Sequence, residues 1–224
     1  MYGLFSAEGD KVVRELLTSD LEVHKVYAVS DWISEHGHLA SPDQLEEVSG
    51  KELERITEQR TPNGVLAVAP LPPAPERIPD SGWILALDRI RDPGNMGTLL
   101  RTADWFALSA VALSPECVDP WNSKVIQSAM GSLFRMPIIH KALDALIAES
   151  GLEAFGADAG GKDYRKVELP SSGILVIGNE ARGLDPAVSP SLSQVLQIPG
   201  QGKAESLNAA VAGGILMAAI PGKA

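Results

Sequence analysis

The chain contains one cysteine, Cys117, among 224 residues. A single cysteine excludes an intrachain disulfide and a thiolate metal cluster, and none of the four histidines stands at ligand-like spacing from it. We therefore expect neither a structural metal nor a redox centre.

Long apolar runs are also missing. The longest weakly polar stretch, residues 207–220, is interrupted by Asn208 and is shorter than the roughly 20 residues that a membrane-spanning helix needs. The first residues carry acids at Glu8 and Asp10 and show no apolar core of a signal peptide. With 45% hydrophobic residues, the chain is expected to be globular, soluble and cytoplasmic, without a membrane segment.

Two common nucleotide-binding patterns do not occur. The chain has no GxxxxGK[ST], and no GxGxxG follows a predicted strand. These absences argue against a P-loop nucleoside triphosphatase and against a nucleotide-binding fold of the Rossmann type.

Positive charge is scarce, and a net charge of −10 is unfavourable for binding nucleic acid. The acid is concentrated in the front part: residues 1–70 hold 6 Lys and Arg against 13 Asp and Glu, whereas residues 71–224 hold 13 against 16. Several arginines lie in or near the polar motifs described below: Arg89, Arg91, Arg101, Arg135 and Arg182. A local positive potential is therefore compatible with the acidic average.

A proline-rich segment, LPPAPERIPDSG (71–82), predicts a linker that is neither helix nor central strand. Residues 1–70 before it predict a small α/β domain. Its expected elements are a helix with Val12, Val13, Leu16 and Leu17 on one face, a strand at VHKVYAV, a helix opened by Ser41 as N-cap and Pro42, a further helix at KELERITEQ, and a strand at GVLAVAP.

After the linker, residues 83–224 alternate between apolar strands and helices. The predicted strands are WILALD, SAVALS, PIIH, LEAFGAD, ILVIG and QVLQIP, and the predicted helices cover 96–106, 123–130, 141–150 and the region from Glu205 onward. This alternation favours an α/β fold with a parallel sheet covered on both faces.

Three motifs in this second part keep polar residues where packing alone does not require them. In LDRIRDPGNMGTLLRTAD (87–104), Asn95 is placed to cap the following helix, and Arg101 is either a surface arginine or a cation at a pocket edge. In LVIGNEARGLDP (175–186), a strand ends at Gly178, and a helix is expected to start at Leu184–Pro186. The turn between them either leaves Glu180 in solvent or bends to meet a ligand.

The third motif, LQIPGQGKAESLNAAVAGGILMAA (196–219), joins polar residues to a helix of unusually small ones. Small residues allow close approach of backbones, so this helix is either tightly packed or part of a dimer interface. Ser206 is then a helix cap or a functional residue.

In order and in residue type, the three motifs resemble those of the SpoU-type (TrmH) RNA 2'-O-ribose methyltransferases of the SPOUT class. The resemblance spans residues 83–220 and implies S-adenosylmethionine as cofactor, a homodimer, and a deep trefoil knot in the C-terminal part. The front region resembles the L30e-like RNA-binding domain of these enzymes, through EGDKVVRELL and RTPNGVLAVA.

The resemblance also implies roles for particular residues. The catalytic group is expected to comprise Asn95, Arg101, Glu180, Ser206 and Asn208. Arg101 matches the arginine proposed to bind the target phosphate and to help remove the 2'-hydroxyl proton; because arginine is a poor base, a positioning role is physically easier. The cofactor pocket is expected to include Gly178, Asn179, Gly183, Ile198, Gly200 and Leu207. The chain departs from the family at Ala181, where glycine is frequent, and at Gly200, where methionine is frequent.

The expected reaction is methyl transfer to a ribose 2'-oxygen of ribosomal or transfer RNA, and the L30e-like domain favours ribosomal RNA. The acidic front region keeps a second hypothesis open, a non-catalytic RNA-binding or ribosome-assembly factor with the same fold. The joint presence of Arg101, Glu180, Ser206 and Asn208 argues against that alternative, since a binding protein does not need all four.

Overall fold

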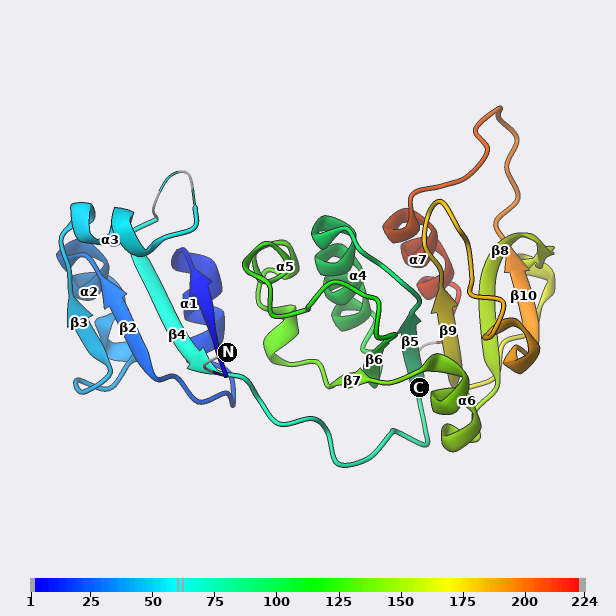
Figure 1. Ribbon diagram of the computed structural model, residues 1–224, viewed down its shortest axis with the longest axis horizontal. Coiled ribbons are helices and arrows are strands. Elements are labelled where there is room, and N and C mark those ends of the chain that lie inside the picture. The colour runs from blue at the N-terminus through cyan, green and yellow to red at the C-terminus, as the bar shows by residue number, and fades with distance from the viewer. Residues whose placement is uncertain (1–2, 60, 62, 222–224) are drawn as a thin grey trace. The chain divides into compact units, whose positions relative to one another are not determined.

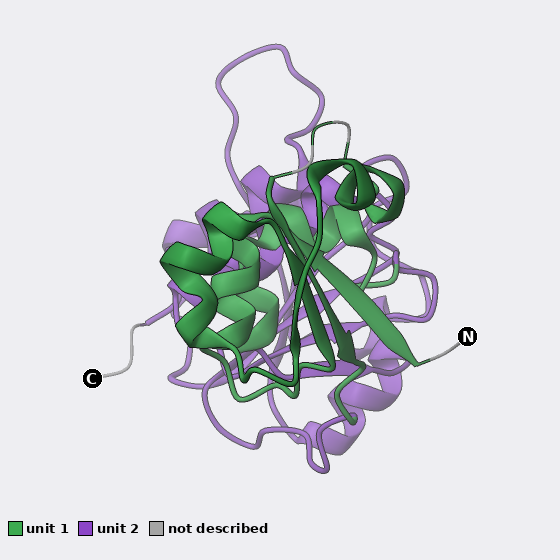
Figure 2. Cartoon of the chain, turned by 90° about the vertical axis from the view of Figure 1, so that its left-hand side faces the viewer, with its two compact units in different colours: residues 1–73, 119–135 green, residues 74–118, 136–224 purple. Residues whose placement is uncertain are grey.

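The computed structural model describes residues 3–59, 61 and 63–221. Contacts divide the chain into two compact units, unit 1 with residues 1–73 and 119–135 and unit 2 with residues 74–118 and 136–224 (Figure 2). Arg60 and Pro62, part of the second stretch that resembles the L30e-like domain, lie outside the described residues.

Unit 1 contains a four-stranded sheet with the order β1-β4-β2-β3, in which β2 and β3 are parallel and the other pairs are antiparallel (Figure 1). Its elements are β1 (Leu4–Glu8), α1 (Asp10–Leu17), β2 (Lys25–Ala28), α2 (Ser30–His36), β3 (Leu45–Glu47), α3 (Gly50–Ile56), β4 (Val65–Pro70) and α5 (Ser123–Ala129), with short 3-10 turns at Gly37–Leu39 and Ser132–Phe134.

Helix α1 follows the predicted pattern, because Val12, Val13 and Leu16 recur on one face and are buried. Helix α3 begins with a capping box, in which Ser49 and Glu52 satisfy each other's backbone N–H groups. The bond from the Ser49 N–H lowers the pKa of the Glu52 carboxyl. Local sequence signals therefore set both helices.

The helix predicted to open at Ser41 and Pro42 is wrong. Residues 42–44 form a turn that leads into β3, which pairs with β2. The Gln44 side chain closes this turn, because its oxygen accepts from the Ser41 hydroxyl at 2.9 Å while its amide donates to the Val23 carbonyl at 2.6 Å. Pairing between strands therefore outweighs a local capping signal. Strand β1 and helix α2 were not predicted.

The segment 71–82 contains neither helix nor strand. Beyond it, unit 2 contains a six-stranded sheet with the order β10-β8-β9-β5-β6-β7, and every neighbouring pair is parallel. Its elements are β5 (Trp83–Leu87), α4 (Pro93–Trp105), β6 (Ala110–Leu113), β7 (Ile138–His140), α6 (Leu143–Ser150), β8 (Ala154–Asp163), β9 (Gly173–Ile177), β10 (Gln194–Gln197) and α7 (Ala209–Met217), with 3-10 turns at Tyr164–Lys166 and Ser189–Ser191.

Helices cover both faces of this sheet. Helix α6 packs with Ile84, Ala86 and Val176 in one buried cluster. Since side chains alternate along a strand, Ile177 faces the opposite side, and there it lies close to Gly213 of α7. Helix α7 in turn packs against α4. The predicted parallel α/β architecture is confirmed.

Two predicted helix starts in unit 2 are wrong. Helix α7 begins at Ala209 with Asn208 as its N-cap, so residues 205–208 precede it and Ser206 is no cap. No α-helix starts at Leu184–Pro186; the chain turns there because the Asp185 side chain accepts from the Ala187 N–H at 2.8 Å.

Candidate functional site

The first motif follows β5 and forms the start of α4. Asp92 caps the helix, because its side chain accepts from the Asn95 N–H at 2.8 Å, and Pro93 occupies the first helical position. The prediction that Asn95 is the cap is therefore wrong. With Asp92 in that role, the Asn95 side chain is available for another partner.

That partner is Glu180, in the turn after β9. Its Oε1 accepts from Asn95 Nδ2 at 2.7 Å and from Asn208 Nδ2 at 2.6 Å. Asn208 Nδ2 also lies 2.9 Å from Asn95 Oδ1. One side chain from each of the three motifs thus meets in a single polar group, which we call the three-motif cluster: Asn95, Glu180 and Asn208.

Asn208 links this cluster to helix α7. Its Oδ1 accepts from the N–H groups of Ala210 at 2.9 Å and Val211 at 3.2 Å, so the oxygen caps the helix while the amide nitrogen reaches Glu180. The Ala209 N–H adds a third donor to Glu180 Oε1 at 3.3 Å. The start of α7 therefore orients the carboxylate. No donor among the described residues reaches the other carboxylate oxygen, Oε2.

The turn that carries Glu180 is narrow. Gly178 and Gly183 lie so close that a Cβ on Gly178 would be 2.5 Å from the Gly183 carbonyl oxygen, and Gly183 has a φ of 63°. Asn179 shapes the turn from inside, because its Oδ1 accepts from the N–H groups of Ala181 and Arg182. The three residues predicted here for the cofactor pocket, Gly178, Asn179 and Gly183, are therefore also required by the geometry of the turn.

Two predicted catalytic residues do not touch the cluster. Arg101 is exposed on α4 and, among the described residues, has no hydrogen-bond or ion-pair partner. At the rise of an α-helix it is about 9 Å along the axis from Asn95. Ser206 is exposed in the loop 198–208 and has no side-chain partner in the described part of the chain. The structure thus brings together three of the five predicted catalytic residues.

The loop 198–208 carries the remaining predicted cofactor residues, Ile198, Gly200 and Leu207. It extends from the sheet between β10 and α7 (Figure 1). Leu207 is an apolar side chain that is 44% exposed, and Gly200 has open space around it. S-adenosylmethionine combines a flat aromatic base, whose faces pack against apolar side chains, with a cationic sulfonium, so an uncovered leucine and the Glu180 carboxylate suit these two parts. The chemistry of these residues fits the cofactor.

An apolar groove of about 550 Å³ adjoins the three-motif cluster between α4 and α7. It begins at Asn95 and Asn208 and continues along small or apolar side chains. Val211, which lines it, is 51% exposed. An exposed apolar surface of this kind beside a polar site marks a binding face.

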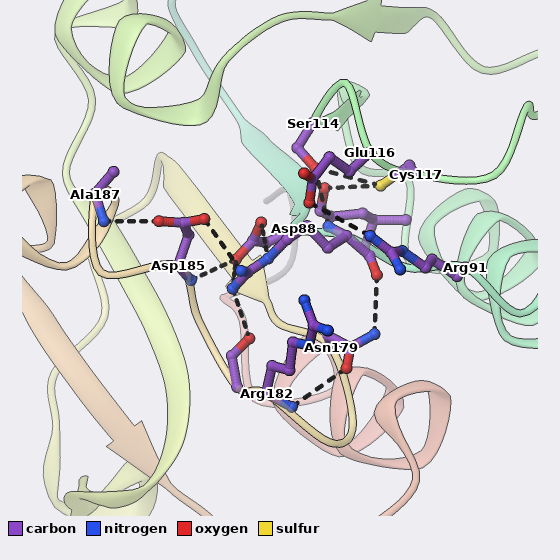
Figure 3. A network of polar contacts seen from close by, with 12 residues as sticks. Asp88, Arg91, Ser114, Glu116, Cys117, Asn179, Arg182, Asp185 and Ala187 are labelled. Carbon is purple, nitrogen blue, oxygen red and sulfur yellow. Dashed lines mark hydrogen bonds and ion pairs between the residues drawn. The ribbon is translucent and has the colours of Figure 1, made fainter.

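The sequence did not indicate a second polar group at the other end of the Glu180 turn. Asp88, which is only 2% exposed, accepts from the Asp185 N–H at 2.6 Å (Figure 3). The Arg89 guanidinium forms ion pairs with both carboxylates, at 3.2 Å from Asp88 and 3.1 Å from Asp185. The available signal was Asp88 itself, an acid directly after the continuous apolar strand β5.

The described residues contain no group of three His, Cys, Asp or Glu side chains that could hold a metal ion. In the same part of the chain, no helix has the length and apolar character needed to cross a membrane.

Comparisons with known proteins agree with this geometry. Residues 82–218 match the SpoU rRNA Methylase family, and residues 1–67 match the MRM3-like substrate binding domain. The 23S rRNA (guanosine(2553)-2'-O)-methyltransferase RlmP of Bacillus subtilis (strain 168) is 34% identical over 217 residues, which cover 95% of this chain and 86% of that protein.

Two solved structures are similar over nearly the whole chain. A TrmH-family protein from Porphyromonas gingivalis has a TM-score of 0.87 at 33% identity, with 97% of this chain and 89% of that one covered. The AdoMet-bound rRNA methyltransferase from Sinorhizobium meliloti has a TM-score of 0.87 at 28% identity, with 97% and 87% covered. The family match spans more than half of the sequence and covers the first two motifs and all but the last residue of the third. The chain belongs to the SpoU rRNA methylase family.

Proposed function

We propose that this protein transfers the methyl group of S-adenosylmethionine to a ribose 2'-oxygen of ribosomal RNA. The observation that carries the proposal is the three-motif cluster, in which Asn95 and Asn208 hold the Glu180 carboxylate. The relative from B. subtilis, which is named for 2'-O-methylation of 23S rRNA, supports the substrate class. With a ribosomal substrate, we expect the protein in the cytoplasm.

The reaction requires the protein mainly to align the methyl donor with the ribose oxygen and to place charge beside them. When bound, S-adenosylmethionine supplies a methyl group on a positively charged sulfur, which is already electrophilic. Glu180 places a negative charge at the cluster, and its Oε2 has no donor among the described residues. We infer that this oxygen is available to the ribose hydroxyl, whose proton must leave as the oxygen gains the methyl group.

The proposed cofactor pocket consists of the turn at Gly178, Asn179 and Gly183 together with the loop 198–208. In the turn, the backbones of Gly178 and Gly183 approach each other more closely than residues with side chains could. The loop contributes Ile198, Gly200 and Leu207. We further propose that this C-terminal part forms the trefoil knot of the SPOUT class, and that the chain is organised as residues 1–70, the linker 71–82 and the catalytic domain 83–224.

Arg101 and the apolar groove support a homodimer. Arg101 is exposed and has no contact with the three-motif cluster. One helical turn beyond it, Trp105 is 83% exposed. A second copy of the chain that covers the groove would bury Val211 and could supply its own Arg101 to the cluster. We therefore propose that Arg101 acts on the site of the partner subunit, where it binds the phosphate of the target nucleotide.

Complementation between subunits tests that arrangement. Arg101→Ala and Glu180→Gln are each expected to abolish methyl transfer in homodimers. Mixed dimers regain one intact site if the arginine comes from the partner, so an equal mixture should reach about a quarter of the wild-type rate. An inactive mixture that contains verified mixed dimers would place Arg101 in the site of its own chain.

Unit 1 is proposed to hold the RNA, and one surface suits that role in spite of the unit's acidity. A cavity of about 390 Å³ between α1 and the end of α2 is lined mainly by basic side chains: Lys11, Arg14, His36 and His38, with Glu15, Thr18 and Leu39. The nearby acid Asp10 is engaged with Arg14 at 2.9 Å and with His36 at 3.3 Å. Lys11 therefore projects into a region where the acid is already paired.

Charge reversal tests this surface. Lys11→Glu is expected to weaken binding of a ribosomal RNA fragment several fold and to reduce the salt dependence of its affinity by about one phosphate contact. Lys51→Glu, an exposed lysine on α3, is the matched control and should change affinity less. Equal losses in the two variants would show that only overall charge matters.

Transfer of tritiated methyl groups to ribosomal RNA from a strain that lacks this protein tests the reaction itself. The expected result is label in one ribose 2'-O-methyl nucleotide, with free RNA, ribosomal subunits and transfer RNA supplied in parallel. Label in transfer RNA alone would change the substrate class. Absence of label from all three substrates, together with no binding of S-adenosylmethionine, would favour the non-catalytic RNA-binding factor.

A further inference from the structure

Arg89 has an unusual backbone conformation directly after β5. Its φ is 55°, in the left-handed region, where a residue other than glycine loses about 1 kcal/mol or more. A conformation of this kind persists only where the surroundings hold it, and such positions concentrate at functional sites. The contacts of Arg89 show what holds it.

Both backbone polar groups of Arg89 form hydrogen bonds with side chains. Its N–H donates to Ser114 Oγ at 2.9 Å, and its carbonyl accepts from Asn179 Nδ2 at 3.0 Å. The same Asn179 side chain accepts from the N–H groups of Ala181 at 3.0 Å and Arg182 at 3.2 Å. Because Arg89 adopts the left-handed conformation, its carbonyl can hold the Asn179 side-chain amide. That amide in turn shapes the start of the turn that carries Glu180.

The side chain of Arg89 reaches the end of the same turn. Its Nη1 lies 3.1 Å from Asp185 Oδ2, and its Nη2 lies 3.4 Å from the Gly183 carbonyl oxygen. Nη2 also donates to Asp88 Oδ2 at 3.3 Å, and that oxygen accepts from the Asp185 N–H. Figure 3 shows Asp88, Asn179 and Asp185 within this network of polar contacts.

Electrostatics make the guanidinium necessary at this position. Asp88 is buried after β5, and the Asp185 carboxylate lies beside it, so the two negative charges need a cation between them. The Arg89 side chain is itself only 12% exposed. Arginine can serve several acceptors at once because its planar group carries five donors.

We propose that Arg89 is a positioning residue of the methyl-transfer site. With its carbonyl it holds the start of the turn 179–185, and with its guanidinium it holds the end, so that Glu180 stays against Asn95 and Asn208. Arg89 touches neither substrate nor cofactor in this role. The inference rests on the proposed function for its effect on the rate, but the clamp on the turn can be measured without any reaction.

Three substitutions test the guanidinium half of the clamp. Arg89→Gly removes the guanidinium and also relieves the strain of the positive φ, whereas Arg89→Ala removes the guanidinium and keeps the strain that the wild type has. Arg89→Lys keeps the charge but loses the planar group. The matched control is Arg165→Gln, which breaks another arginine–aspartate pair, between Arg165 and Asp163 at 2.8 Å, in an exposed position.

In Arg89→Gly, we expect kcat to fall between about 10-fold and 100-fold at saturating substrates, as for a small misplacement of a catalytic group. The KM for RNA should change little, because Arg89 does not contact RNA. Arg89→Lys should recover part of kcat, and Arg89→Ala should be less stable than Arg89→Gly by thermal melting. Arg165→Gln should leave kcat unchanged. A kcat for Arg89→Gly equal to that of the wild type overturns the proposal.

Amide hydrogen exchange of the free protein gives the independent measurement. In Arg89→Gly, the N–H groups of Ala181, Arg182 and Asp185 should exchange faster, while those of β5 and α4 stay protected and show that the fold persists. Unchanged exchange in the turn overturns the clamp, whatever the activity. If the wild type methylates no RNA, the proposed function fails, and the exchange rates still decide whether Arg89 holds the turn.

Discussion

Asn208 donates its side-chain N–H to Glu180 at 2.6 Å while its oxygen caps helix α7. One residue thus performs a structural and a site-forming role with different atoms. Because the two roles use different atoms, substitutions can separate them.

We predict that Asn208→Ser keeps the cap and loses the contact with Glu180, since a serine hydroxyl accepts from the same N–H groups but is too short to replace the amide. Its free energy of unfolding should stay within about 0.5 kcal/mol of the wild type, while Asn208→Ala should lose about 1 kcal/mol. Both variants should lose most methyl transfer. Chemical denaturation and the tritium assay measure the two effects, and full activity in Asn208→Ser would remove the amide from the site.

A second prediction concerns the closeness of Gly178 and Gly183. A methyl group on Gly178 would lie 2.5 Å from the Gly183 carbonyl oxygen, and backbone on both sides leaves no side chain to move away. Gly178→Ala should therefore lower the free energy of unfolding by about 1–3 kcal/mol. Gly200→Ala is the control for stability, because nothing lies within 4 Å of the added carbon. Equal denaturation midpoints for the two variants would contradict the close packing.

Most of unit 2 could be predicted from the sequence because each parallel strand is a continuous apolar run between breakers. The failures are local signals that tertiary contacts outweigh. Ser41 and Pro42 form a good helix start, but pairing of β3 with β2 requires an extended chain there. The prediction for Asn95 fails for a local reason instead, because Asp92, three residues earlier, caps α4.

The site was less accessible to sequence reasoning. Glu180 meets partners 85 and 28 residues away, and no periodicity indicates such a meeting. The resemblance to a family implied five catalytic residues, of which Asn95, Glu180 and Asn208 meet in the structure, while Arg101 and Ser206 do not join the group. The role of Arg89 depends on a left-handed backbone conformation, which the sequence does not reveal for an arginine.

Cys117 provides a prediction that depends on pH. Burial raises the pKa of its thiol, and its Sγ donates to the Leu87 carbonyl at 3.2 Å. A higher pKa lowers the fraction of thiolate at any given pH, so labelling by a disulfide reagent at pH 8 should be much slower in the native protein than in denaturant. The native rate should rise as the pH increases further. Equal rates in the folded and unfolded protein would contradict a buried thiol.

The last prediction tests where the cofactor binds. Leu207 is 44% exposed and directly precedes Asn208, so the larger indole ring of a tryptophan at this position would occupy the space proposed for S-adenosylmethionine. Leu207→Trp should abolish cofactor binding in calorimetry while the thermal melting temperature changes little, since the side chain is in an exposed loop. Leu71→Trp, in the segment between the two predicted domains and 39% exposed, is the matched control and should bind normally. Normal affinity in Leu207→Trp would move the pocket away from the start of α7, and the turn at Gly178, Asn179 and Gly183 would then remain as its proposed wall.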